Sequence, residues 1–168
     1  MATTKLKGNP VQTYGPLPET GSTAKDFLLT TNALQDRSLA DYKGQKILLN
    51  VFPSVDTAVC AMSVRKFNSE AAEVPDAVIL CVSRDLPFAL GRFCGAEGID
   101  RAITLSEMRN RDFGRDYGLE IIDGPMAGLL ARAVLVIDQE GRIVYRQLVD
   151  DITHEPDYET ALEELKKL

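Results

Sequence analysis

Residues 47–60 read ILLNVFPSVDTAVC, and this stretch decides the fold. Its first six residues form a short, mostly apolar run that predicts a buried β-strand. Beyond the loop that begins at Pro53, the residues Cys60, Val64 and Phe67 recur at the spacing of one helix face. We therefore expect a strand that leads through a short loop into a helix, with Cys60 in the first turn of that helix.

The predicted position of Cys60 has a chemical consequence. The first N–H groups of a helix have no partner within the helix, and the positive end of the helix dipole lies beside them. Both features favour a thiolate over a thiol, so Cys60 is a candidate nucleophile. Taken alone, the same residue also suits a small buried hydrophobe, and Thr57 before it suits a simple helix cap.

The remaining elements follow from turn residues and apolar periodicity. Residues 4–14 predict a small hairpin that turns at Gly8-Asn9-Pro10, and residues 77–82 predict a second buried strand. Asp85 and Pro87 predict the cap and the first turn of a second helix. Further elements are expected as short strands at 27–29 and 103–105, a short helix at 112–117, a hairpin of 131–137 with 143–149, and a final amphipathic helix at 157–168.

This order of elements predicts one α/β domain over residues 1–168, with a central mixed sheet flanked by helices on both faces. The net charge is −6, and no long basic block offsets it, which argues against binding to nucleic acid or to an anionic membrane. No apolar segment has the length of a signal peptide or a membrane span. We therefore expect a cytoplasmic protein.

The three cysteines are Cys60, Cys81 and Cys94, an odd number at wide spacing that does not form a secreted disulfide framework. Cys81 lies inside an apolar run, so we expect it to be inert packing. His154 is the single histidine and stands in a predicted loop. With one histidine and scattered cysteines, the sequence predicts no metal site and no cofactor.

The stretch from Phe52 to Cys60 resembles the active-site loop of the peroxiredoxins, in which Pro, Thr and Cys stand at this spacing. The segments around Arg65, Cys94 and Arg132 are similar to one branch of that family, the atypical two-cysteine thiol peroxidases of bacteria. The likeness covers nearly the whole chain. It implies a thioredoxin-like fold with an N-terminal β-hairpin, a homodimer, and reduction of peroxides with electrons from thioredoxin.

The resemblance also implies a role for each site residue. Cys60 attacks the peroxide, Thr57 hydrogen-bonds the thiolate and the peroxide, and Pro53 excludes water. Arg132 stabilises the thiolate and the leaving oxygen, as a permanently charged guanidinium can. Cys94 then attacks the sulfenic acid on Cys60 to form an intrachain disulfide, and thioredoxin reduces that disulfide.

Two cysteines on separate helices often lie too far apart for a disulfide, which needs Cα atoms within about 7 Å. Gly91, Gly95 and Gly98 flank Cys94, and each is expected to weaken the helix by roughly 1 kcal/mol relative to Ala. We therefore expect residues 88–97 to melt or shift in every turnover.

Two other functions remain open from the residues. A dithiol oxidoreductase of thioredoxin type needs Cys-x-x-Cys at the helix start, but Ser63 stands where the second thiol would be. A redox sensor would use Cys60 as a switch that is oxidised about once per protein, whereas an enzyme consumes many equivalents of peroxide.

Overall fold

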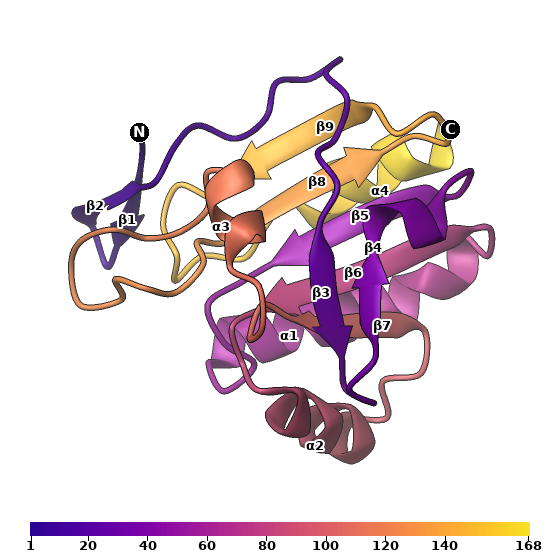
Figure 1. The fold of residues 1–168 in the computed structure, drawn as a ribbon, viewed down its shortest axis with the longest axis horizontal. Helices are drawn as coiled ribbons and strands as arrows, with labels where there is room; N and C mark the ends of the chain where they lie inside the picture. The colour runs from indigo at the N-terminus through magenta and orange to yellow at the C-terminus, as the bar shows by residue number, and fades with distance from the viewer.

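The computed structural model describes residues 1–168 and contains a seven-stranded mixed sheet (Figure 1). Its strands are β3 (Leu28–Thr31), β4 (Asp36–Ser38), β5 (Lys46–Val51), β6 (Ala77–Ser83), β7 (Ala102–Ser106), β8 (Ala133–Ile137) and β9 (Ile143–Leu148). Their order across the sheet is β4-β3-β7-β6-β5-β8-β9. The central strands β5, β6 and β7 are parallel, and the outer pairings are antiparallel. The predicted central mixed sheet is confirmed.

Four α-helices surround this sheet: α1 (Ala58–Glu70), α2 (Pro87–Glu97), α3 (Asp112–Asp116) and α4 (Tyr158–Lys166). Short 3₁₀ turns at Leu39–Tyr42 and Ala71–Glu73 complete the helical segments. One apolar cluster joins α1 and α4 to the sheet, and a second cluster on the other face includes residues of α3. Figure 1 shows α3 in front of the sheet, with α1 and α4 behind it. Helices on both faces are therefore confirmed.

Helix α1 forms where the apolar spacing predicted it. Cys60, Val64 and Phe67 are each fully buried in the cluster beneath the sheet. Because a helix turns by 3.6 residues, these positions share one face and pack together against the strands. The strand, loop and helix at residues 46–70 are thus fixed by burial of a continuous apolar surface.

The N-terminal hairpin is confirmed, but of the predicted turn residues only Gly8 lies in the turn, and Asn9 and Pro10 belong to β2. Strands β1 (Ala2–Leu6) and β2 (Asn9–Thr13) pair antiparallel around Lys7 and Gly8, which have φ values of 51° and 83°. Two left-handed residues in a two-residue loop match the twist of a hairpin. Pro10 lies within β2 opposite Lys5, which a two-stranded ribbon tolerates because a proline there removes only one ladder donor.

The cap of α2 and the role of Gly98 differ from the prediction. Leu86 is the N-cap residue, Pro87 is the first helical residue, and no side chain caps the helix, so Asp85 is not the cap. At the other end Gly98 lies beyond the helix in a left-handed conformation with φ of 65°. A glycine there terminates a helix favourably, so only Gly91 and Gly95 weaken α2 from within.

The carboxyl ends of β5 and β6 lie together with the start of β8, at the left of Figure 1 and on the side of the β1–β2 hairpin. Loops that follow adjacent parallel strands meet at one edge of a sheet, where α/β proteins commonly bind their ligands. The loop before Cys60 and the residue Arg132 both belong to this edge. No helix of the structure has the length and apolar character that crossing a membrane requires.

Candidate active site

Cys60 is the third residue of α1 and is completely buried. Strand β5 delivers the chain to this point, because the Phe52 N–H donates to the Val82 carbonyl at 3.1 Å and extends the parallel pairing by one step. Residues 53–57 then turn the chain into α1, with Thr57 as the N-cap residue. The predicted placement of Cys60 in the first helical turn is confirmed by this geometry.

Arg132 contacts the sulfur of Cys60 directly. Its Nη2 donates to Cys60 Sγ at 3.1 Å, and its Nε donates to the Ile152 carbonyl at 2.9 Å. The side chain is only 1% exposed, and Nη1 has no partner in the protein. Arg132 reaches this place because β8 is antiparallel to β5, so the start of β8 lies beside the end of β5. Arg132 is therefore no surface charge.

The charge and the donors of Arg132 determine how it can act on the sulfur and on a bound substrate. A guanidinium keeps its proton at all ordinary pH values and has five N–H donors in a fixed plane. One donor is fixed by Ile152, one meets Cys60, and the Nη1 donors remain free. Buried polar groups are nearly always hydrogen-bonded. The free Nη1 can thus donate to an oxygen placed beside the sulfur.

Thr57 and Pro53 lie beside this pair, in the loop before α1. Thr57 Oγ1 donates to the Ser54 carbonyl at 3.1 Å, and its side chain caps no helical N–H. No hydrogen bond joins Thr57 to Cys60, so the contact expected from the resemblance stays a prediction. Since a hydroxyl accepts through two lone pairs, Thr57 Oγ1 can still receive a hydrogen bond from a substrate. Pro53 is buried.

A pocket of about 240 Å³ adjoins these residues. Arg132 contributes to its lining, whereas Cys60 does not, so Arg132 connects the pocket with the buried sulfur. The surface of the pocket is largely apolar. Its lining comprises Leu6, Pro53, Thr57, Ala58, Val59, Met126, Arg132, Ile152 and Thr153.

No residue pattern predicts the supports of Arg132, which come from a backbone carbonyl and from the N-terminal hairpin. The Ile152 N–H donates to the Lys5 carbonyl at 2.8 Å, so the segment that holds Arg132 is itself tied to β1. Next to it, Asp151 accepts hydrogen bonds from Thr153 and from the N–H groups of the hairpin turn, at 2.8 Å for Gly8. These bonds, led by that of Thr153, hold the pKa of the Asp151 carboxyl well below its usual range.

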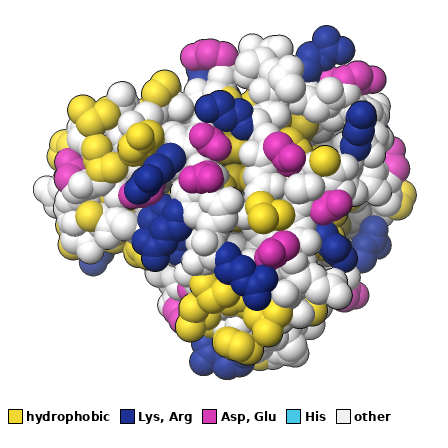
Figure 2. Space-filling model, viewed as in Figure 1, with side chains coloured by type: hydrophobic (Ala, Val, Ile, Leu, Met, Phe, Trp, Pro, Cys, Tyr) yellow, Lys and Arg dark blue, Asp and Glu magenta, His cyan; other side chains and the backbone are white.

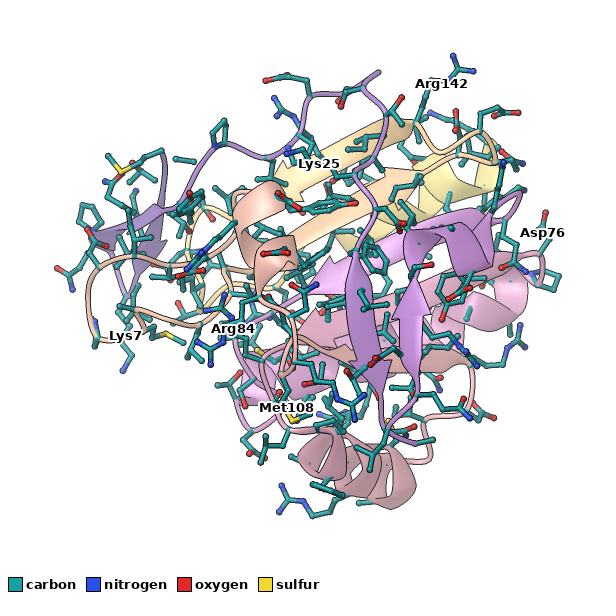
Figure 3. The ribbon with its side chains drawn as sticks, viewed as in Figure 1. Lys7, Lys25, Asp76, Arg84, Met108 and Arg142 are labelled. Carbon is teal, nitrogen blue, oxygen red and sulfur yellow. The ribbon has the colours of Figure 1, made fainter.

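A buried ion-pair network supports the loop that precedes Arg132. Arg84, which follows β6, pairs with Glu107 at 3.0 Å and Glu120 at 2.9 Å, and also donates to the Gly128 carbonyl. Figure 3 shows Arg84 at the left of the sheet, toward the side on which Lys7 of the hairpin turn lies. Burial raises the pKa of Glu107, and the adjacent Arg84 opposes that rise. The network joins β6 to the loop at residues 119–131.

Cys94 stands apart from this group. It lies on α2, is partly buried, and its Sγ is 3.6 Å from Thr104 Oγ1 on β7. Burial raises the pKa of the Cys94 thiol, and the hydrogen bond with Thr104 lowers it in part. All three cysteines are free thiols in this structure. The site thus contains Cys60 with Arg132, Thr57 and Pro53, while Cys94 lies outside it.

Cys81 is fully buried in β6, where its nearest polar neighbour is Asn50 Nδ2 at 3.8 Å from the sulfur. Burial raises the pKa of the Cys81 thiol to about 12. A thiol that stays protonated at neutral pH is a poor nucleophile, so the expected packing role fits this position. No group of three or more His, Cys, Asp or Glu side chains is placed to hold a metal ion.

Comparison with known proteins identifies the family. Residues 19–162 match the family model described as Redoxin. A thiol peroxidase of Corynebacterium glutamicum is 50% identical over 162 residues, which cover 96% of this chain and 98% of that protein. The chain belongs to the peroxiredoxins, in their thiol peroxidase branch.

Solved structures agree with this assignment. A peroxiredoxin-like protein from Aquifex aeolicus is 38% identical and superposes with a TM-score of 0.94, covering 99% of this chain and 97% of the other. A thiol peroxidase from Chromobacterium violaceum superposes with a TM-score of 0.90 over 98% of this chain and 95% of the other. At 20% identity that second likeness shows the fold alone. The thioredoxin-like fold and the expected family are both confirmed, and this peroxiredoxin is a peroxidase.

The structure also bears on the dithiol alternative. Ser63, which stands in place of a second thiol, donates from Oγ to the Cys60 carbonyl at 2.8 Å and accepts from Asn50 Nδ2 at 3.2 Å. It therefore serves as a buried hydrogen-bonding group inside α1. A thioredoxin-type exchange through a Cys-x-x-Cys motif has no second sulfur here.

Proposed function

We propose that this peroxiredoxin reduces hydrogen peroxide and organic hydroperoxides through Cys60. The thiolate sulfur attacks the terminal oxygen of the O–O bond, and the electron pair of that bond leaves with the other oxygen. The leaving oxygen takes a proton and departs as water or an alcohol. The reaction leaves a sulfenic acid on Cys60 and changes no other residue of the protein.

The observation that carries this proposal is the buried contact between Arg132 Nη2 and Cys60 Sγ at 3.1 Å. Arg132 favours the charged nucleophile before the reaction, because a fixed positive charge stabilises a thiolate. Its unpartnered Nη1 can donate to the leaving oxygen as negative charge develops there. Both donors are fixed before the substrate arrives, since Nε is held by the Ile152 carbonyl.

The pocket supports organic hydroperoxides as substrates in addition to hydrogen peroxide. Leu6, Val59, Met126 and Ile152 offer apolar contacts for an alkyl or lipid chain, and Arg132 supplies the cation near the reacting oxygens. Apolar walls with a single charged group suit a molecule that has a hydrocarbon body and one polar end. The proposed physiological role is antioxidant defence.

We assign the second half of the cycle to Cys94. Its thiolate attacks the sulfenic sulfur of Cys60, hydroxide leaves as water after protonation, and an intrachain disulfide forms. Cys60 is completely buried, and Cys94 Sγ contacts Thr104 Oγ1 on β7 in the reduced protein, so we expect α2 to open or shift before the sulfurs meet. A thiol reductant then restores both thiols, and we propose thioredoxin as that electron donor.

Two cysteine variants test the assignment. Cys60→Ser should abolish peroxide consumption, because a serine hydroxyl is not ionised at neutral pH. Cys94→Ser should consume one equivalent of peroxide per protein and then stop or oxidise further. Peptide mapping of the wild-type protein after one equivalent of peroxide should recover a Cys60–Cys94 disulfide. Recovery of a disulfide through Cys81 instead would refute the assignment of Cys94.

A coupled assay separates the enzyme from a sensor and identifies the donor class. With catalytic thioredoxin, its reductase and excess peroxide, the wild-type protein should consume many equivalents of peroxide. If the protein consumes only about one equivalent of peroxide with thioredoxin but many equivalents with a small dithiol, it is a peroxidase and thioredoxin is not its electron donor. Insulin reduction in the absence of peroxide is expected to be negligible.

We also propose a homodimer in the cytoplasm. An exposed apolar patch over α2 supports the dimer: Leu86 is 54% exposed and Phe88 is 69% exposed (Figure 2). Three free thiols suit a reducing compartment. Phe88→Glu should lower the molar mass measured by light scattering toward that of a monomer. An unchanged molar mass would contradict a dimer interface at Phe88.

A further inference from the structure

Asp85 lies at the carboxyl end of β6, directly before the first residues of α2, and its carboxylate faces the loop before Cys60. Ser54 Oγ donates to Asp85 Oδ1 at 2.6 Å, and the Val55 N–H donates to Oδ2 at 2.9 Å. Ser83 Oγ also donates to Oδ2, at 2.7 Å. A side chain that was expected to cap α2 thus binds the active-site loop instead.

The backbone of Asp85 is fixed independently of α2. Ser106 Oγ on β7 donates to the Asp85 carbonyl at 2.5 Å, and the Glu107 N–H donates to the Ser83 carbonyl at 2.9 Å. These bonds join the ends of two neighbouring parallel strands. The carboxylate of Asp85 is therefore presented from the end of the sheet and not from α2.

The bonds to Asp85 continue through Ser54 to the first turn of α1. Ser54 Oγ accepts from the Asp56 N–H at 3.1 Å. The Ser54 carbonyl accepts from Thr57 twice, from its N–H at 3.2 Å and from its Oγ1 at 3.1 Å. Thr57 is the N-cap residue of α1, and its own carbonyl accepts from the Ala61 N–H at 3.0 Å. Asp85 is thereby connected through Ser54 to the N-cap residue of α1.

We propose that Asp85 is a positioning residue for peroxide reduction, which aligns Cys60 and Thr57 with Arg132 by holding the loop at residues 54–57. The inference rests on the proposed function of Cys60. Productive attack requires reacting groups to be held within a narrow range of distance and angle. Ser54 and Val55 of the loop supply that restraint through their bonds to the carboxylate, and Ser83 of β6 fixes the carboxylate itself. Hydrogen bonds to a charged acceptor are stronger than those between neutral groups.

The two chemical steps should respond differently to the loss of this restraint. Attack on peroxide needs the loop closed and Cys60 aligned with Arg132. Disulfide formation instead needs the fully buried Cys60 to become accessible to Cys94. Loosening the loop should therefore slow sulfenic acid formation and leave disulfide formation unchanged or faster. A general loss of packing would not be expected to affect the two rates in opposite ways.

The principal variant is Asp85→Ala, with Asp85→Asn and Ser54→Ala as milder changes. Asp85→Asn keeps one acceptor oxygen. Ser54→Ala removes the bond to Oδ1 and the bond that Ser54 Oγ accepts from the Asp56 N–H, and it keeps the bond from the Val55 N–H to Oδ2. Asp56→Ala is the matched control: Asp56 belongs to the same loop, but its side chain makes only an exposed ion pair with Arg92 at 3.3 Å. Exposed pairs of this kind contribute little.

The experiment measures the two steps separately by quenched flow with one equivalent of peroxide, followed by alkylation and mass spectrometry. For Asp85→Ala we expect sulfenic acid to form about tenfold more slowly, the size of effect associated with a lost hydrogen bond to a charged group. Asp85→Asn and Ser54→Ala should fall between this variant and the wild type. Disulfide formation should be at least as fast as in the wild type, and Asp56→Ala should stay within about twofold in both steps.

Hydrogen exchange provides a readout that does not depend on peroxide. In reduced Asp85→Ala, the amide of Val55 should exchange faster than in the wild type, while the strand amides keep their protection. An unchanged or faster first step, or equal slowing of both steps, would overturn the inference, as would unchanged exchange at Val55. Failure of the wild-type protein itself to form a sulfenic acid at Cys60 would instead refute the proposed function.

Discussion

Stabilising α2 should slow disulfide formation without affecting the attack on peroxide. Pro87 and Leu90 are the only buried residues of helix α2, so little packing holds it against the sheet. Gly91 and Gly95 lie inside it. An added Cβ at Gly91 would meet Asn32 Cβ at 3.7 Å, an ordinary contact, and an added Cβ at Gly95 would meet nothing within 4 Å. Alanine therefore fits at both positions without a clash.

The magnitude follows from helix propensity. Each Gly→Ala change in the interior of a helix favours the helical state by about 1 kcal/mol, so Gly91→Ala together with Gly95→Ala should favour it by about 2 kcal/mol. If opening of α2 is an equilibrium that precedes attack by Cys94, the rate of disulfide formation falls by the same Boltzmann factor. One change should slow this step about fivefold and both changes about thirtyfold. The sulfenic acid should persist, and oxidation to the sulfinic acid should increase.

Gly98→Ala is the control of opposite sign. Gly98 has φ of 65°, a conformation that costs an alanine about 1 kcal/mol or more, and no atom lies near its missing Cβ. The end of α2 should fray, and disulfide formation should accelerate.

The chain has no tryptophan to report on the step, so acid quenching with thiol alkylation is the suitable assay. If the Gly→Ala variants stabilise the helix but form the disulfide at the wild-type rate, then α2 does not open in this step.

Three further outcomes are expected. Arg132→Met should slow sulfenic acid formation roughly 10- to 150-fold, the factor that corresponds to a lost charged hydrogen bond of about 1.5–3 kcal/mol, and wild-type peroxide kinetics would refute the role of Arg132. Cys81→Ala should leave turnover within about twofold because its thiol is protonated at neutral pH, and a large loss in the steady-state assay would contradict the packing role. Disulfide formation should accelerate from about pH 7 to about pH 9. Burial raises the pKa of the Cys94 thiol while α2 is closed, so deprotonation of this thiol favours the open form of the helix. A rate of disulfide formation that does not change with pH would contradict this linkage.

The sequence predicted those elements whose apolar pattern is local and continuous. The runs before Pro53 and at residues 77–82 became β5 and β6, because burial on both faces leaves little choice of structure. Strand β4 was missed since Asp36–Ser38 is short and polar, and exists only through its pairing with β3. The hairpin turn was misplaced because Lys7, a non-glycine residue, adopts a left-handed conformation that sequence preference does not favour.

The site was only partly accessible to sequence reasoning. Cys60 could be placed from the strand and helix on either side of it. Arg132 lies 72 residues away, and only the resemblance, not the residue pattern, joined it to Cys60. The Ile152 carbonyl that fixes Arg132 is a backbone group and leaves no trace in the sequence. Asp85 could be identified in the sequence, but its predicted role as the cap of α2 was wrong, because an acidic residue just before a helical proline ordinarily predicts a cap.

In the cycle proposed above, the two thiols need opposite properties, and the two helices that carry them differ in packing. Cys60 is part of a helix whose inner face is packed into the core, and a buried cation contacts its sulfur. Cys94 lies on a helix with two internal glycines and few buried side chains. If both helices were equally firm, the sulfenic acid could not be resolved before a second peroxide arrived. If both were equally loose, Arg132 could not hold Cys60 ready for the first. In the proposed cycle, a closed site for attack and an accessible one for resolution therefore require α2 to open more readily than α1.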